Sequence, residues 1–215
     1  MRTILITESD LLSSQAIPFI YLASQSPRRS QLLDQMGVPH QLLLADATED
    51  SEELEIAVKN EAPLAYVTRV TALKLDAAVL RLKLRGLPQA PVLCADTTVA
   101  KGRVLYGKPE SKADAARMLA ELSGATHRVL TSVAVSHGRK SRQAVSESRV
   151  TFAKLSKAQI DRYIATGEPM GKAGSYAVQG RAATFIAKIS GSYSGIMGLP
   201  MFETAQLLSQ LGFDI

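Results

Sequence analysis

Residues 19–36 read FIYLASQSPRRSQLLDQM, an apolar run followed by a polar turn and then by apolar residues at helical spacing. The first five of these residues are apolar and predict a buried strand. Ser26 is a preferred N-cap residue and Pro27 suits the first helical position, so a helix is expected to begin there. The stretch therefore predicts a strand that leads directly into a helix.

Arg28 and Arg29 fall in the first turn of that predicted helix. A helix N-terminus offers free N–H donors and a partial positive charge, and two adjacent guanidinium groups repel each other unless an anion shares the site. The arrangement favours a phosphate chain as ligand. The alternative is that two exposed arginines simply solvate the helix, and this segment alone leaves both interpretations open.

Strand and helix patterns continue to alternate along the chain. Strands are expected at residues 40–44, 91–100, 104–106, 128–136, 143–152, 176–179 and 184–189. Helices are expected at residues 63–84, 111–124, 156–167 and 199–211, and the acidic stretch 46–55 indicates a loop or a helix start. The pattern predicts a mixed α/β fold, with an elongated twisted sheet flanked by helices. Without an internal repeat or a composition break, a single domain is expected over residues 19–215, after an extension of residues 1–18.

Composition narrows the class of protein. Of 215 residues, 46% are hydrophobic and 21% are charged, which is ordinary for a globular protein, and the formal net charge is +5. The basic residues are dispersed and there is no Trp, so an anionic small molecule is favoured over nucleic acid as a partner. No stretch approaches the ~20 apolar residues of a membrane span, and the first residues lack a signal-peptide pattern. A cytoplasmic protein without a membrane partner is therefore expected.

The cysteine and histidine content offers no metal or disulfide pattern. Cys94 is the only cysteine and lies in an apolar run, where it is interpreted as a small core residue. His40, His127 and His137 lack the spacing of a metal site.

Two acidic residues are candidates for chemistry. Asp96 lies in the apolar run 91–100, where an unpaired carboxylate is costly to bury, so it either forms a structural ion pair or holds a metal or activates water. Glu49, in the acidic stretch, is a second candidate, although a solvated loop charge is the simpler interpretation. Such carboxylates suit a hard divalent cation such as magnesium.

One segment resembles the start of a P-loop, but that interpretation is rejected. Residues 102–108, GRVLYGK, match the opening of a P-loop, yet Pro109 stands where Ser or Thr would hold magnesium, and the segment is expected in a hairpin. Lys108 remains a candidate cation because Gly107 and Pro109 restrict the backbone around it, although a surface lysine is the simpler interpretation. Lys74 is a further cation that could serve phosphates.

The glycine-rich segment 171–183 is a candidate ligand-binding loop. Its glycines permit close approach of the backbone to a flat ligand. Gln179 lies within it, and its amide could make paired hydrogen bonds to a base edge. The alternative is an ordinary turn residue.

Six short motifs, in this order, resemble the Maf family of nucleoside triphosphate pyrophosphatases, which is related in fold to the inosine-triphosphate pyrophosphatases. The motifs are LASQSPRR at 22–29, ADT at 95–97, GKP at 107–109, LSGATH at 122–127, KAGSYAVQG at 172–180 and GLP at 198–200. The resemblance implies hydrolysis of a nucleoside triphosphate to the monophosphate and pyrophosphate. It also implies a divalent cation, Mg²⁺ or Mn²⁺, as cofactor, and a homodimer.

The resemblance assigns roles residue by residue. Asp96 matches the acidic residue regarded as the catalytic base, and Glu49 matches a second acidic position near the metal. Positions that contact phosphate in the family are matched by Ser24, Arg28, Arg29, Lys74 and Lys108.

Three positions distinguish two branches of the family. The branch that prefers a methylated guanosine triphosphate usually has an aromatic residue where Arg28 stands, Gln where Thr97 stands and Glu where Gln179 stands. This chain resembles the other branch, the dTTP/UTP pyrophosphatases, at all three. The implied substrates are dTTP, UTP and modified pyrimidine nucleotides, and the implied role is to keep aberrant nucleotides out of nucleic acids.

The chain departs from the family pattern at two places, and one of them favours an alternative function. Gly171 stands where the family usually has Asp, and residues 194–197, SGIM, replace larger side chains. The alternative function is a nucleotide-binding regulator of septum formation and cell division with weak or incidental catalysis, and Gly171 is the feature that favours it.

Overall fold

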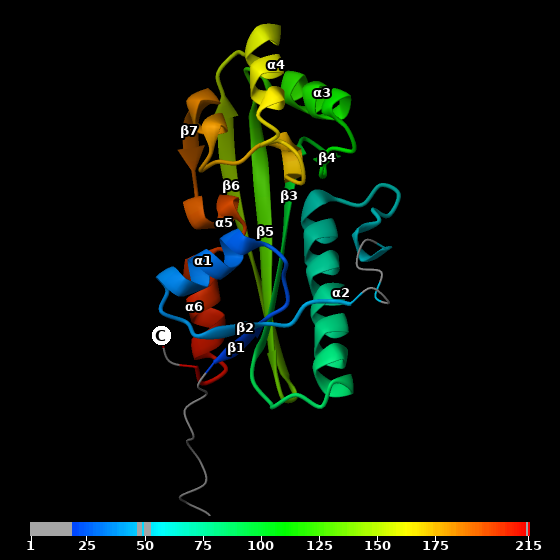
Figure 1. Cartoon of the computed structure of the whole chain (residues 1–215), viewed down its shortest axis with the longest axis vertical. Coiled ribbons are helices and arrows are strands. Elements are labelled where there is room, and N and C mark those ends of the chain that lie inside the picture. The colour runs from blue at the N-terminus through cyan, green and yellow to red at the C-terminus, as the bar shows by residue number, and fades with distance from the viewer. Residues whose placement is uncertain (1–18, 47–48, 50–52, 214) are drawn as a thin grey trace, which may run out of the picture.

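The computed structural model describes residues 19–46, 49, 53–213 and 215, and its centre is a seven-stranded mixed sheet (Figure 1). The strand order is β2-β1-β3-β5-β6-β7, and β4 pairs with β3 beside this path. The strands are β1 (Ile20–Leu22), β2 (His40–Leu42), β3 (Val92–Lys101), β4 (Val104–Tyr106), β5 (Thr126–His137), β6 (Lys140–Phe152) and β7 (Ile186–Ser190). The sheet is long because β3, β5 and β6 are long and pair side by side along much of their length. The predicted mixed α/β fold with an elongated sheet is confirmed.

Strand direction changes across the sheet. β1 runs parallel to both β2 and β3, whereas β3, β5, β6 and β7 pair antiparallel in turn. Parallel neighbours need a crossover connection, and the helices after β1 and before β3 provide it. The antiparallel part is a meander with a tight hairpin at Gly138, whose φ of +60° suits glycine.

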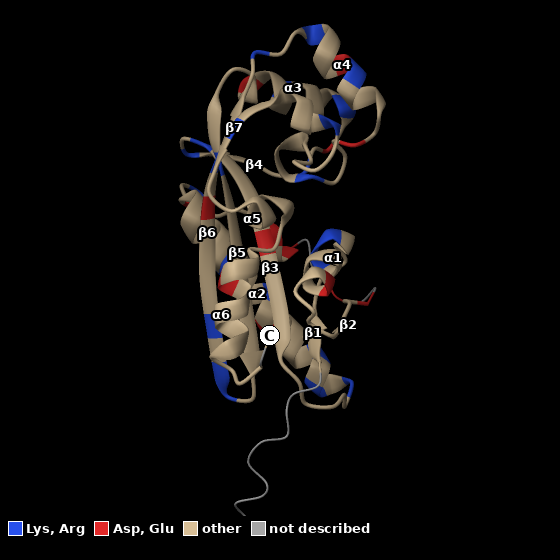
Figure 2. Ribbon diagram, turned by 90° about the vertical axis from the view of Figure 1, so that its left-hand side faces the viewer, with Lys and Arg blue, Asp and Glu red and all other residues tan. Residues whose placement is uncertain are grey.

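Helices cover both faces and one end of the sheet. They are α1 (Pro27–Gln35), α2 (Pro63–Leu84), α3 (Lys112–Leu122), α4 (Lys157–Ala165), α5 (Tyr193–Met197) and α6 (Met201–Ser209). Short 3₁₀ turns lie at Glu53–Glu55, Ala173–Ser175 and Arg181–Phe185. The two views agree that α3 and α4 gather at one end of the sheet, away from α1, α2 and α6 (Figures 1 and 2).

Alternate residues of β3 serve two cores. Leu93 and Ala95 pack with the core that includes α1 and α6, whereas Val92 and Cys94 pack with the core under α2. Successive side chains of a strand point to opposite faces, so a strand covered on both faces reads as a continuous apolar run. Cys94 is a buried core residue, as predicted.

Sequence signals located most helix ends correctly. α2 has the predicted bounds, with Pro63 at its first position and Gly86, at φ +57°, just beyond its end. Ser156 and Gln159 form a reciprocal capping box at α4. Ser26 is the N-cap residue of α1, but its side chain makes no capping hydrogen bond.

Two strand predictions in the glycine-rich region need correction. The predicted strand at 176–179 is wrong: this stretch is a loop after a 3₁₀ turn, and Gly174 and Ser175 there have φ values of +68° and +62°. The strand predicted at 184–189 begins only at Ile186, because residues before it form a 3₁₀ helix. Among the described residues, no helix is long and apolar enough to cross a membrane.

Candidate active site

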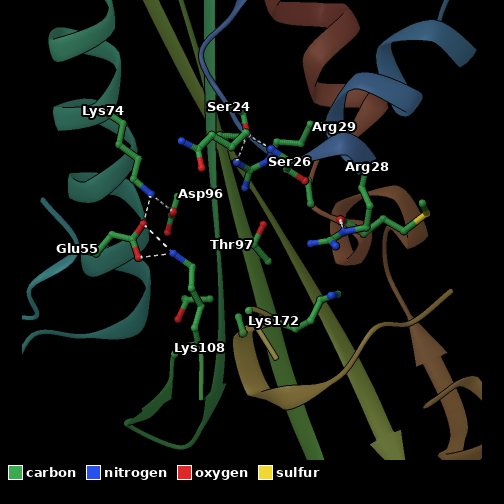
Figure 3. Close-up of a pocket in the computed structure, with 18 of the residues that line it drawn as sticks. Ser24, Ser26, Arg28, Arg29, Glu55, Lys74, Asp96, Thr97, Lys108 and Lys172 are labelled. Atoms are coloured by element: carbon green, nitrogen blue, oxygen red, sulfur yellow. Dashed lines mark hydrogen bonds and ion pairs between the residues drawn. The ribbon is translucent and has the colours of Figure 1, made fainter. Parts of the chain in front are cut away.

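A cleft of about 540 Å³ opens beside the middle of β3 (Figure 3). Its volume lies in the range of small-molecule sites. Segments far apart in the chain line it: the β1–α1 connection, the inner face of α2, β3, the 171–179 loop and the turn after α5. Charged side chains therefore meet here only through the tertiary fold.

One wall carries the two arginines of α1. Arg29 donates from Nε to the Gly198 carbonyl at 2.8 Å and from Nη1 to Oγ of Ser24 at 3.0 Å. Arg28 donates from Nε to the Met197 carbonyl at 3.2 Å. Burial lowers the pKa of both guanidinium groups, although an arginine stays charged in proteins. The backbone of the α5 turn thus aims two cations into the cleft beside a helix N-terminus.

The opposite side holds two carboxylates bound to one ammonium group. Lys74, on α2, donates to Oδ1 of Asp96 at 2.5 Å and to Oε1 of Glu55 at 2.7 Å. Lys108 reaches the same Glu55 carboxylate at 3.0 Å. Figure 3 shows these four side chains converging from α2, β3 and the loops on either side.

The pairing sets the charge of this cluster. Burial alone would lower the pKa of Lys74, but the charges of Asp96 and Glu55 outweigh it and raise the pKa. Burial alone would raise the pKa of Glu55, but Lys74 and Lys108 outweigh it and lower the pKa. The pairing therefore favours the charged forms of Lys74 and Glu55.

Thr97 is tied to the arginine wall. The buried hydroxyl of Thr131 donates to the Gly195 carbonyl at 2.7 Å, so it accepts from Oγ1 of Thr97 at 3.0 Å. Gly195 belongs to α5, and the next turn of chain supplies the carbonyls that hold the arginines. Thr97 is thereby linked to the position of that turn.

The 171–179 loop closes a third side. Gln179 lines the cleft, its side chain is exposed, and it makes no hydrogen bond to another residue in the described part of the chain. Lys172 also points into the cleft (Figure 3). Burial, and then the charge of Arg28, lower the pKa of Lys172. Gly171 lines the cleft with φ +69°, and open space surrounds it.

The structure gathers most of the predicted site residues and separates one of them. Ser24, Arg28, Arg29, Lys74, Asp96, Thr97, Lys108 and Gln179 all line the cleft. Glu49 does not line it: its carboxylate accepts from Nη2 of Arg81 at 2.6 Å and from Nε at 2.8 Å. Its hydrogen bond with Arg81 lowers the pKa of Glu49.

Sequence reasoning did not single out Glu55 and Lys172, two charged residues that line the cleft. Glu55 lies in the same acidic stretch as Glu49, and no local signal distinguished the two. Lys172 lies in the KAGSYAVQG motif, where the glycines and Gln179 drew attention instead. Its place directly beside a glycine-rich turn was the signal that could have found it.

The carboxylates fit a divalent cation that the substrate helps to hold. No group of three or more His, Cys, Asp or Glu in the described residues forms a protein-only metal site. Asp96 and Glu55 nevertheless share one positive partner, so their oxygens converge on one region. Mg²⁺ typically takes one or two carboxylates and completes its shell with phosphate oxygens and water. The donor set fits that mode of binding.

Fold and cleft together define an α/β protein in which a cationic wall faces a cluster of carboxylates and lysines. The chain belongs to the Maf family, because the family model described as "Maf-like protein" matches residues 19–211.

Several relatives match nearly the whole chain. The dTTP/UTP pyrophosphatase of Albidiferax ferrireducens is 68% identical over 197 residues, covering 92% of this chain and 98% of the relative. The dTTP/UTP pyrophosphatase of a Polaromonas species is 62% identical, covering 93% and 99%. A solved structure of the Staphylococcus aureus Ham1 protein aligns over 77% of this chain and 90% of that chain, with a TM-score of 0.40 and 11% identity. That last likeness is too distant to support an assignment.

Proposed function

We propose that this protein hydrolyses dTTP and UTP to the monophosphate and pyrophosphate. The observation that carries the proposal is the pair of carboxylates on Lys74, facing Arg28 and Arg29 across one cleft. Two relatives, 68% and 62% identical over nearly their full length, carry the name dTTP/UTP pyrophosphatase. The role inferred for the chain is to remove unwanted pyrimidine nucleotides from the cell's pool.

Cations of the cleft bind the triphosphate. Arg28 and Arg29 are preorganised by backbone carbonyls, so they hold phosphate oxygens without losing much further side-chain freedom. Ser24 supports Arg29 and lies at the same wall. Lys74 and Lys108, on the other side, offset the charge that develops on the leaving pyrophosphate.

Asp96 is the proposed general base. It accepts the proton of a water molecule that attacks one phosphorus of the α–β anhydride, and the bond to the bridging oxygen breaks to release pyrophosphate. Asp96 and Glu55 are the residues that would hold Mg²⁺ or Mn²⁺, which supplies charge neutralisation to the phosphates when bound. Glu49 would join them only after leaving Arg81, so its metal role is the weaker assignment.

Base choice is assigned to Gln179, Thr97 and Arg28. A uracil or thymine edge presents an acceptor, a donor and an acceptor, and an amide can both donate and accept. Gln179 is free to do so because its side chain makes no other hydrogen bond among the described residues.

A second candidate function is a nucleotide-binding regulator of septum formation with incidental catalysis. The observation that favours it is Gly171 at the cleft wall, where the family usually carries an acid. The assembled Asp96–Lys74–Glu55 cluster favours the enzyme.

Product analysis separates these functions. Purified protein is incubated with UTP and Mg²⁺, and products are resolved by anion-exchange chromatography. Monophosphate plus pyrophosphate supports the proposal, whereas diphosphate plus orthophosphate contradicts it. Binding of UTP without turnover supports the regulator.

The same assay on Asp96→Asn tests the general base. Its matched control is Asp76→Asn, the same substitution at an exposed position of α2 outside the cleft.

A further inference from the structure

A carboxylate behind the cleft has no part in the chemistry described above. Glu168 follows α4 and does not line the cleft, yet it lies against the back of the loop that carries Gln179. Its carboxylate is only partly exposed and receives several hydrogen bonds. A partly buried carboxylate with several hydrogen bonds usually fixes the conformation of the segment to which it bonds.

Glu168 and Tyr163 fasten both ends of that loop. Oε2 of Glu168 accepts from the backbone N–H of Arg181 at 3.0 Å, and Oε1 accepts from that of Ala182 at 3.4 Å. The hydroxyl of Tyr163 donates to Oε1 of Glu168 at 2.9 Å and accepts from the N–H of Ala177 at 3.3 Å. Tyr163 is 3% exposed, so its hydroxyl is fixed by the core of the domain. Residues 177–182 are therefore clamped from behind.

Gly180 is the residue that lets the carboxylate come so close. A Cβ at this position would lie 2.2 Å from Oε1 of Glu168, inside any allowed contact. The backbone there is ordinary, with φ −103°. The glycine is thus required by the contact with Glu168 and not by the conformation of the chain.

Gln179 depends on these contacts for its position. Its side chain is exposed and makes no hydrogen bond to other residues among those described, so the loop backbone sets the point from which the amide reaches into the cleft. That backbone lies between the two fastened ends of the loop. A shift of the loop by a fraction of a hydrogen-bond length would misalign the amide with a base edge.

We propose that Glu168 is a positioning residue for base selection, which holds the 177–182 loop through Tyr163 and two backbone N–H groups so that Gln179 meets a uracil or thymine edge. This inference rests on the proposed function and adds to it a residue outside the cleft. Glu168 touches neither substrate nor metal in this scheme, and its effect is confined to discrimination between bases.

Two variants disrupt the clamp, which is the set of hydrogen bonds from Glu168 and Tyr163 to the 177–182 loop. One changes the carboxylate and the other changes the loop. Glu168→Gln replaces one acceptor oxygen by an NH₂ group, which cannot accept from Tyr163 or from the backbone. Gly180→Ala leaves both clamp side chains in place but forces the carboxylate away from the loop. Glu121→Gln is the matched control, because Glu121 also accepts from a buried tyrosine, Tyr106, at 2.8 Å, but none of its hydrogen bonds among the described residues reaches the 177–182 loop.

The measured quantity is the ratio of kcat/KM for UTP to kcat/KM for GTP. Both clamp variants are expected to lower this ratio about ten-fold, the scale of one lost hydrogen bond in discrimination, mainly through kcat/KM for UTP. The Glu121→Gln ratio is expected to match that of the unmodified protein. Equal losses for UTP and GTP, or an unchanged ratio in folded clamp variants, would overturn the proposal.

A double-mutant cycle with Gln179→Ala tests the route of the effect. If Glu168 acts through Gln179, then Glu168→Gln changes the UTP-to-GTP ratio less than two-fold once Gln179 is already alanine. A full ten-fold change in that background would contradict the inference. Failure of the unmodified protein to release pyrophosphate from UTP would instead refute the proposed function, so the two failures are distinguishable.

Discussion

Acid should weaken this protein through one buried histidine. His127, on β5, is 1% exposed and packs edge-on against Phe152 and Tyr176, and Tyr176 lines the cleft. Its Nε2 pairs with the Tyr176 hydroxyl at 2.9 Å, and its Nδ1 has no hydrogen-bond partner among the described residues. Burial lowers the pKa of His127 from 6.5 to about 4, because the imidazolium would lose its hydration.

The sign and size of the effect follow from proton linkage. Between pH 6.5 and pH 4 the unfolded chain binds a proton at this position that the native chain does not. The contribution that neutral His127 makes to the free energy of unfolding is therefore fully present above pH 6.5 and is lost as the pH falls toward 4. A shift of one pKa unit corresponds to about 1.4 kcal/mol, so the loss contributed by His127 is about 2 kcal/mol at pH 5.

Urea unfolding at pH 7.5 and pH 5 measures this difference. His127→Gln keeps a neutral partner for Tyr176 and should lose about 2 kcal/mol less than the unmodified protein between the two pH values. His137→Gln, at the β5–β6 hairpin, is the control and should behave like the unmodified protein. Glu49 and Glu55, whose pKa values are lowered from 4.5, are present in all three proteins and contribute the same acid loss to each, so the difference between variants reports His127. An equal acid loss in His127→Gln would refute the reasoning.

Three further predictions concern the cleft. Asp96→Asn should lower kcat for pyrophosphate release by about 10²–10⁴-fold, while stability changes little because Lys74 keeps Glu55 at 2.7 Å; near-normal turnover would remove Asp96 from the mechanism. Gln179→Glu should lower kcat/KM for UTP roughly ten-fold or more, because a carboxylate can only accept; equal rates of the unmodified protein on UTP and a methylated guanosine triphosphate would contradict the base assignment. Lys74→Met leaves Asp96 and Glu55 without their shared cation, so Mg²⁺ should raise the melting temperature of this variant more than that of the unmodified protein. An identical Mg²⁺ response of both proteins would argue against a shared cation position.

Local signals determined much of the fold. Pro63 and Gly86 mark the ends of α2 because proline is tolerated at the first turn and glycine readily adopts positive φ beyond the last. The apolar run 91–100 predicted the strand that became β3, and the helix start at Pro27 put Arg28 and Arg29 in the first turn of α1. These features depend on residues close together in the chain, and the sequence displays them directly.

The chain near Gln179 shows where local signals fail. The apolar run 176–178 resembles a strand, but backbone N–H groups of this segment bond to Tyr163 and Glu168 instead of to a neighbouring strand. Those partners lie more than ten residues away, so the local pattern does not reveal them. Tertiary contacts, and not propensity, decided that this segment is a loop.

The choice between two glutamates was likewise made by the tertiary structure. Glu49 and Glu55 lie in one acidic stretch, and the sequence alone offered no reason to prefer Glu55. Lys74 and Arg81 lie two turns apart on the same side of α2, and the chain brings Glu55 to Lys74 and Glu49 to Arg81. The sequence by itself thus determined which residue types were available for phosphate, metal and base. The docking of α2 against β3 decided which carboxylate shares a lysine with Asp96, because ion pairs between distant segments depend on how those segments pack.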